Sequence, residues 1–112
     1  MFVLVVKLKA IKGNEEAIEK AIREATQKVR ENERDTLMYD THRKIGNSSE
    51  ILLYERYRDR SAWEVNHMSK PYIKELLEKL SQYTLGKPEA EEYELVEVLG
   101  GGAWESNPPE TV

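Results

Sequence analysis

Two stretches of helical periodicity, each lying between extended stretches, limit most strongly what this chain can fold into. In residues 15–31 apolar side chains recur every three or four positions, which predicts a helix with one apolar face. A second apolar stripe follows Pro71, a residue suited to the first turn of a helix. This stripe consists of Tyr72, Ile73, Leu76, Leu77 and Leu80. Both helices need an apolar surface on which to pack.

Extended segments around the helices can supply that surface. MFVLVVKLKA, at residues 1–10, opens with the β-branched, apolar run of a buried strand. DTLMYDTHRK (35–44) and EILLYERYR (50–58) predict two further strands, joined by a turn at IGNSS. TLGKPEAEE is predicted to be a connector, and YELVEVL (93–99) is predicted to be the last strand. Asp59 or Ser61 can cap the second helical region, which should break near Ser69.

The resulting order is β-α-β-β-α-β, which is typical of a ferredoxin-like α+β sandwich. In that fold two helices cover one face of a four-stranded antiparallel sheet. A chain of 112 residues suits one such domain, which we expect to span residues 1–99. The remaining GGGAWESNPPETV, residues 100–112, is rich in Gly and Pro. We expect it to be a flexible tail or, through Trp104, a segment that docks on a partner.

The predicted sheet has apolar side chains on both faces. Residues of the third strand alternate between Ile51, Leu53, Glu55 and Tyr57 on one side and Leu52, Tyr54, Arg56 and Arg58 on the other. Two helices cover one face only, and a large exposed apolar patch normally marks an interface. We therefore expect a homodimer that forms through the sheet face.

Composition excludes several classes of function. There are 17 basic and 21 acidic residues, with no basic stripe, which argues against nucleic acid as a partner. The chain has no cysteine, so disulfides, thiolate catalysis and cysteine metal sites are excluded. His42 and His67 lack a metal-ligand spacing, and we predict no metal site. The longest apolar run, at residues 2–6, is too short to span a membrane, so a soluble cytoplasmic protein is expected.

One segment carries a family resemblance. It contains the motif Glu55-x-Tyr57-x-Asp59-x-x-Ala62-Trp63, followed by Ser69 and Tyr72. This resembles the antibiotic biosynthesis monooxygenase (ABM) family of dimeric α+β barrel proteins, which typically carry Glu-x-aromatic-x-Asp, then Ala-Leu-x-x-His and Thr-Pro-His-Phe. MYDTHRK resembles their second strand, and the resemblance covers residues 2–99. It implies a dimeric barrel and a cofactor-independent oxidation of a quinol, anthrone or similar aromatic substrate by O₂.

The chain departs from the family pattern at both histidines. The first falls on Asn66, and His67 comes one residue later. One residue on an α-helix is a rotation of about 100°, so His67 cannot simply inherit that role. The second falls on Pro71. In the related haem-degrading branch, the functional Asn, Trp and His correspond to Val6, Asn66 and Leu76, and this mismatch disfavours haem degradation.

The oxidation that the family implies needs a base, a donor to a developing oxyanion, and a dry aromatic pocket. His67 is the candidate catalytic base, and Asn66 the candidate donor. The alternatives are a surface imidazole at the helix break and an amide that caps the helix or faces solvent. Trp63, Tyr72 and Tyr57 are expected to line a substrate pocket between helices and sheet, although Trp63 would pack in either case.

Glu55 is an unusual residue because it alternates with apolar side chains. If its face is covered, the carboxylate must pair or shift its pKa. Pairing with Arg or Lys across the dimer is favoured over proton transfer, and Glu55 remains a candidate substrate-binding residue. Two other functions stay open: a module that binds a small molecule without turnover, and a pure assembly domain whose cavity is filled by Trp63 and Tyr72.

Overall fold

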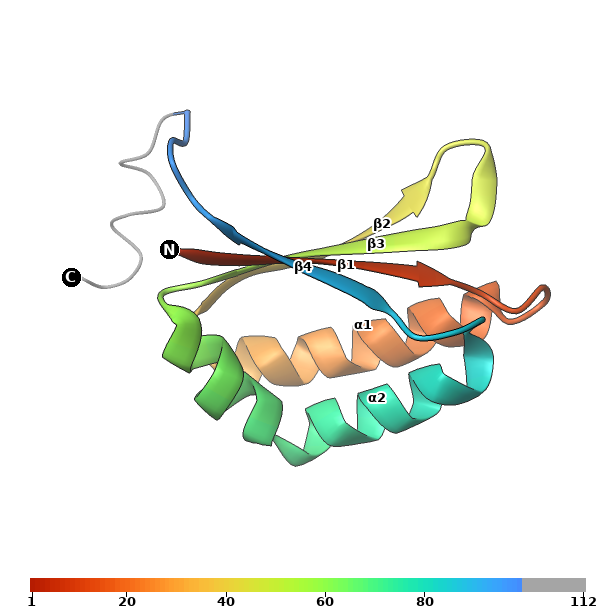
Figure 1. Cartoon of the computed structure of the whole chain (residues 1–112). Coiled ribbons are helices and arrows are strands. Elements are labelled where there is room, and N and C mark those ends of the chain that lie inside the picture. Colours follow the sequence, from red (N-terminus) through yellow and green to blue (C-terminus); the bar gives the residue numbers. More distant parts are fainter. Residues whose placement is uncertain (100–112) are drawn as a thin grey trace.

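The computed structural model describes residues 1–99, so the expected tail and its Trp104 lie outside the described residues. Figure 1 shows two long helices on one face of a sheet. In chain order the elements are β1 (Phe2–Lys9), α1 (Glu15–Asn32), β2 (Thr36–Lys44), β3 (Asn47–Tyr57), the short turns η1 (Ala62–Asn66) and η2 (His67–Ser69), α2 (Pro71–Tyr83) and β4 (Glu89–Glu94). None of the described helices is long and apolar enough to cross a membrane.

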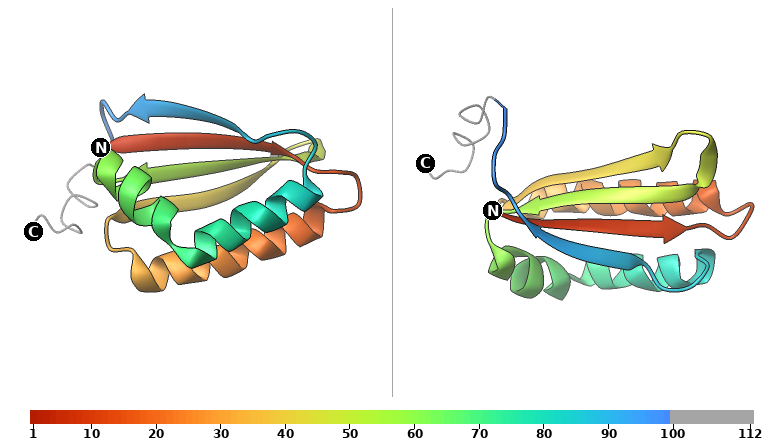
Figure 2. Two further views of the ribbon diagram at one scale, coloured as in Figure 1. Left: turned by 60° about the horizontal axis from the view of Figure 1, so that its bottom comes forward. Right: turned by 45° about the horizontal axis from the view of Figure 1, so that its top comes forward.

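The sheet has the strand order β2-β3-β1-β4, and every neighbouring pair is antiparallel (Figure 2). With both helices on one face, this is the ferredoxin-like α+β sandwich that the sequence predicts, and the prediction is confirmed. Alternation along each strand divides the sheet. Leu8 and Ile51 face the helices and are buried, whereas their neighbours Lys7 and Leu52 belong to the opposite face, which we call the outer face.

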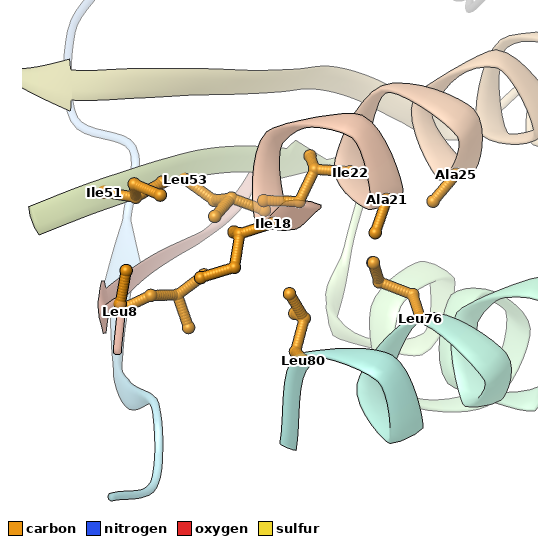
Figure 3. Close-up of a cluster of buried hydrophobic side chains, with 10 residues drawn as sticks. Leu8, Ile18, Ala21, Ile22, Ala25, Ile51, Leu53, Leu76 and Leu80 are labelled. Atoms are coloured by element: carbon orange, nitrogen blue, oxygen red, sulfur yellow. The ribbon is translucent and has the colours of Figure 1, made fainter. Parts of the chain in front are cut away.

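The main apolar core lies between the helices and one end of the sheet. Figure 3 shows its side chains pointing toward one another from α1, α2, β1 and β3. Its buried members are Leu8, Ala10, Ile18, Ala21, Ile22, Ala25, Ile51, Leu53, Leu76 and Leu80. The predicted stripe of α1 is thus largely buried, and in α2 Ile73, Leu76 and Leu80 are buried, whereas Leu77, which the sequence placed in the same stripe, is 43% exposed. Each large side chain contributes about 1.5–3 kcal/mol when removed from water.

The last strand lies earlier than the sequence pattern predicts. We expected it at residues 93–99, but β4 spans Glu89–Glu94 and pairs with β1 alone. Every residue of β4 is exposed, so this edge strand is held by backbone hydrogen bonds and needs no apolar face. Charged residues are common on such edges because they prevent further pairing. The apolar Val96 and Leu99 that suggested a later strand are almost fully exposed.

The second helical region breaks near Ser69, as predicted, and its first part is irregular. The backbone N–H of Ala62 donates to Asp59 Oδ1 over 2.9 Å, so Asp59 rather than Ser61 caps this region. Turn η1 is π-helical, and the N–H of His67 bonds to the carbonyls of both Ala62 and Trp63. At the other helix, the Asn14 side chain makes no cap and donates to the Ile11 carbonyl instead.

Candidate functional site

Ionisable and hydroxyl-bearing side chains meet where β3 leads into η1, at the opposite end of the sandwich from the apolar core. Glu33 directly follows α1, and the other residues lie on β2, β3, η2 and α2. We call them the polar cluster, which consists of Glu33, Tyr39, Glu55, Tyr57, His67 and Tyr72. Four of the six were expected from the sequence, and the other two, Glu33 and Tyr39, were not.

A histidine–carboxylate pair is the centre of the cluster. His67 Nδ1 lies 2.7 Å from Glu33 Oε1, and the exposed fractions of the two side chains are 3% and 0%. The same carboxylate accepts hydrogen bonds from the hydroxyls of Thr36, over 2.6 Å, and Tyr72, over 2.5 Å. Because a carboxylate only accepts, Nδ1 of the imidazole carries the proton in this bond. In a neutral ring the other nitrogen, Nε2, is then free to accept one.

The hydrogen bonds keep Glu33 ionised inside the protein. Burial raises the pKa of Glu33, but the bonds from His67, Thr36 and Tyr72 outweigh it and hold the pKa below its ordinary value. Burial and the bond to Glu33 raise the pKa of Tyr72, so its hydroxyl stays protonated. The pair therefore consists of a fixed carboxylate and an imidazole in one orientation.

Glu55 has a different environment from Glu33. It accepts a hydrogen bond of 2.6 Å from the Tyr57 hydroxyl, and both residues are buried. Burial raises the pKa of Glu55, and the Tyr57 hydrogen bond opposes this only in part. Within the described chain Glu55 bonds to a tyrosine on its own strand, whereas its expected pairing across a dimer stays a prediction. The two carboxylates of the cluster are thus shifted in opposite directions.

Aromatic rings enclose the imidazole. The ring centroids of Tyr39 and Tyr57 lie 5.4 Å and 5.3 Å from that of His67. Burial, together with the charges of Glu55 and Glu33, raises the pKa of Tyr39 well above its ordinary value. Its hydroxyl makes no hydrogen bond within residues 1–99. The ring of Tyr39 therefore lies beside the imidazole, and its protonated hydroxyl is a donor that has no acceptor within residues 1–99.

The π-helical turn explains how His67 reaches the interior. On an α-helix, a residue five positions after Ala62 would be rotated by about 100° from one four positions after it. A π-turn closes a hydrogen bond over five residues and so absorbs one extra residue. His67 donates its N–H to the Ala62 carbonyl in this way, and its side chain is buried. The extra residue of the turn thus accompanies a His67 that lies in the interior beside Glu33.

Trp63 and Asn66 lie around the polar cluster rather than in it. The Trp63 ring stacks on Phe2 at 5.2 Å and packs with the small apolar group of Leu4, Tyr57 and Ala62. Asn66 is partly exposed, and its backbone carbonyl accepts the Ser69 hydroxyl. With Glu33, it lines a surface hollow of about 480 Å³. The structure therefore brings His67, Tyr57, Glu55 and Tyr72 together and leaves the amide outside.

A larger hollow reaches the cluster from the edge of the sheet. This hollow, which we call the edge trough, lies between α1 and β2 and has a volume of about 630 Å³. Its lining includes Arg23, Thr26, Gln27, Arg30, Tyr39 and Thr41. Tyr39 is the polar-cluster residue that lines it, and His67 is not among its lining residues.

Comparison with known proteins identifies the family. The sequence profile described as "Antibiotic biosynthesis monooxygenase" matches residues 1–79, which is most of the chain. The chain belongs to the ABM family. No curated protein matches its sequence.

Solved structures share the fold of this ABM family member at low sequence identity. A "putative antibiotic biosynthesis monooxygenase" of Caulobacter crescentus is 24% identical with a TM-score of 0.80, covering 86% of this chain and 90% of its own. The protein of the same description from Nitrosomonas europaea is 18% identical with a TM-score of 0.79, covering 87% and 100%. That from Deinococcus radiodurans is 17% identical with a TM-score of 0.78, covering 88% and 96%.

Sequence reasoning on this ABM family member missed Glu33 because the residue lies 34 positions before His67. One signal was present. Glu33 follows the last turn of α1, where the helix dipole disfavours a negative charge. A carboxylate in that position needs a compensating partner. Among residues 1–99 no group of three or more His, Asp or Glu side chains is placed to hold a metal ion.

Proposed function

We propose that this ABM family member is a monooxygenase that oxidises a quinol, anthrone or similar electron-rich aromatic with O₂, without a cofactor. The observation that carries the proposal is the buried imidazole of His67, whose Nδ1 proton is held by an ionised Glu33. A carboxylate that fixes the tautomer and orientation of an imidazole is a recurrent arrangement for a general base.

The proposed reaction needs few groups from the protein. For an anthrone, His67 removes a proton from the methylene carbon, and the resulting enolate passes one electron to O₂. The two radicals combine at that carbon, and loss of water from the hydroperoxide leaves a carbonyl. One oxygen atom of O₂ enters the product, while the other leaves as water with the two hydrogens of the methylene group.

The edge trough supplies an approach to this base. We place the substrate ring in the trough against Tyr39, whose hydroxyl is protonated and has no acceptor within the described chain. That phenol is positioned to donate to the enolate oxygen, the role that we expected of Asn66. A small movement of the Tyr39 ring would then open His67 to the substrate, since the two rings are in contact.

The homodimer expected from the sequence is part of the proposal. One half of the outer face carries Val5, Met38, Tyr54 and Tyr93, of which Met38 and Tyr93 are 38% and 50% exposed. A second copy packed there would remove these groups from water. Sedimentation as a monomer at micromolar concentration would contradict it. The expected cytoplasmic location stays a prediction.

Oxygen uptake with a panel of anthrones and quinols tests the proposal. We expect enzyme-dependent uptake that falls at least about a hundredfold in His67→Gln, which is the usual contribution of a general base. Glu78→Gln is the control, because Glu78 is exposed on α2 and does not line the edge trough. The proposal fails if uptake never exceeds spontaneous oxidation, or if both variants behave alike.

One observation favours a second function, a module that binds a small molecule without turnover. His67 is only 2% exposed and the edge trough stops at Tyr39, so a ligand can occupy the trough without touching the base. Thermal melting of the same protein with the same aromatics separates the two functions. A rise in Tm without oxygen uptake would support binding alone.

A further inference from the structure

The edge trough carries an excess of positive charge. Its charged lining residues are the cations Arg23, Arg30 and Arg43 and the carboxylates Glu19 and Asp40. The whole chain, by contrast, has a formal net charge of -4. A cationic hollow in an acidic protein attracts anionic ligands.

The arginines of the trough differ in how far their charge is already used. Arg43 binds both oxygens of Glu19, through Nε over 2.8 Å and Nη2 over 2.6 Å. Arg23 reaches the same carboxylate only at 3.7 Å. Arg30 makes no ion pair within residues 1–99, and its hydrogen bond of 2.7 Å goes to the side-chain oxygen of Gln27, which is uncharged. Arg30 is therefore a cation of the trough that has no carboxylate partner in the described chain.

Arg30 lies at the end of the trough where Tyr39 stands. α1 and β2 are joined by a short connection and run in opposite directions (Figure 2). Near the far end Arg43 meets Glu19. From Arg43 to Tyr39 the strand covers about 13 Å. The same distance along α1 from Glu19 is about nine residues, which leads to the turn between Thr26 and Arg30. The unpaired guanidinium and the phenol ring therefore share one end of the trough.

This end of the trough opens on the helix side of β2. Tyr39 stands opposite the buried Glu55, which faces the helices. Asp40 stands opposite Tyr54, so by alternation its side chain belongs to the outer face and does not point toward Arg30. The proposed homodimer covers the outer face and leaves the helix side of this edge open.

We propose that the substrate taken by the edge trough is an aromatic acid, whose ring lies against Tyr39 and whose carboxylate is bound by Arg30. The inference rests on the proposed function and narrows its substrate class. A guanidinium presents parallel N–H groups that match the two oxygens of a carboxylate. Arg23, which is held only weakly by Glu19, supplies a second positive charge further along the trough.

Binding of 2-naphthoate and of neutral 2-naphthalenemethanol, followed by two-dimensional amide NMR of the full chain, tests the acid site. Neither compound is a substrate for the proposed oxidation, so the measurement does not depend on turnover. We expect naphthoate to bind more tightly than the alcohol and to shift the amides of Arg30, Tyr39 and Thr41. R30Q should weaken naphthoate binding about fivefold, the upper end for an exposed ion pair, and change binding of the alcohol less than about twofold.

The control is K20Q, which removes one positive charge from the same helix at an exposed residue outside the trough. We expect it to bind naphthoate within about twofold of the parent chain. Equal losses in R30Q and K20Q would overturn the proposal, because only general charge would then matter. Equal affinity of the parent chain for the acid and the alcohol would overturn it as well. Amide dispersion shows directly whether each variant is folded.

Oxygen uptake with anthrone and with anthrone-2-carboxylate separates this inference from the proposed function. R30Q should raise KM for the acid about fivefold and leave kcat nearly unchanged, because the carboxylate is bound equally before and during the reaction. H67Q should instead lower kcat for both compounds. Uptake with the same KM for both compounds in the parent chain would overturn the substrate class and leave the oxidation standing. Absence of uptake together with selective binding of naphthoate would overturn the oxidation and leave the acid site standing.

Discussion

The two ends of the helix–sheet layer are built on the same strands and helices, yet they differ in content. At one end β3 contributes Ile51 and Leu53, and α1 contributes Ile18 and Ile22, all within the apolar core (Figure 3). At the other end, in the polar cluster, β3 contributes Glu55 and Tyr57, and Glu33 directly follows α1. The same architecture therefore provides an apolar region and a polar one that contains the proposed base.

The two ends stabilise the protein by different means. The apolar end gains free energy simply by removing hydrocarbon from water. In the polar cluster each buried group costs free energy unless it finds a partner. Within residues 1–99, Glu33 meets this cost with three hydrogen bonds, whereas Glu55 has the single bond from Tyr57. Substitutions should therefore give large, pH-independent losses at the apolar end and smaller, pH-dependent effects in the cluster.

Among the substitutions that compare the two ends, Ile22→Ala at the apolar end should have the largest effect on stability. Ile22 is fully enclosed between α1 and the sheet, so truncation removes transfer free energy and leaves a cavity. We expect the free energy of unfolding in urea to fall by about 3–4 kcal/mol, with little change between pH 4 and pH 8. Leu77→Ala is the control, since Leu77 is 43% exposed and should lose less than about 1 kcal/mol. Similar losses in both variants would refute the assignment of the core.

Glu33→Gln should have an intermediate effect that depends on pH. The variant loses an ionised acceptor of three hydrogen bonds, at a cost of about 2 kcal/mol at pH 7. The pKa of Glu33 is lowered in the folded protein, so its stabilising contribution is present above the ordinary value of 4.5 and is lost as the pH falls through the lowered pKa. Urea unfolding of the parent protein and of the variant between pH 7 and pH 3 should show that their free energies of unfolding converge as the pH falls.

Glu55→Gln is the matched variant, and its effect on the stability at pH 7 should have the opposite sign. The pKa of Glu55 is raised in the folded protein, so its contribution is present below 4.5 and is lost as the pH rises through the raised pKa. A neutral amide, which can still accept the Tyr57 hydroxyl, avoids this loss. We expect the variant to be more stable than the parent by up to about 1 kcal/mol at pH 7 and to lose that advantage on acidification. Parallel pH profiles for the two variants would show that the carboxylates do not differ as described.

The fold could be predicted because the features that determine it are local. The stripe Ile18, Ala21, Ile22 and Ala25 on α1 repeats with helical periodicity, and the same residues are buried. β4 was misplaced for the converse reason. Its six residues are all exposed, so they form no apolar pattern. The backbone hydrogen bonds that hold them to β1 cannot be predicted from such a pattern.

The site could be predicted only where the polar cluster is contiguous in sequence. Glu55, Tyr57, His67 and Tyr72 fall in one segment with a family motif, and the structure brings them together. Glu33 joins them through contacts between residues 34 and 39 positions apart, which no local pattern specifies.

A deletion in η1 tests what orients His67 toward the polar cluster. If η1 is an α-helical turn carrying one inserted residue, deletion of the 65% exposed Val65 should be tolerated. The shortened turn would place the histidine four residues after Ala62, so that the same N–H meets the same carbonyl in an α-helical bond. We expect a loss below about 1 kcal/mol and an unchanged Nδ1–H resonance of His67 in NMR.

Deletion of Lys74 is the control for the Val65 deletion, because α2 is a regular helix and loses its register when shortened. That deletion rotates Leu76 and Leu80 by about 100° relative to Ile73, and we expect the chain to lose most of its stability or fail to fold. If both deletions were equally damaging, the π-turn would be required by its surroundings, and the extra residue would itself be part of the site. If only the Lys74 deletion is damaging, the histidine is held by Glu33 and its aromatic neighbours, and the turn merely adapts to them.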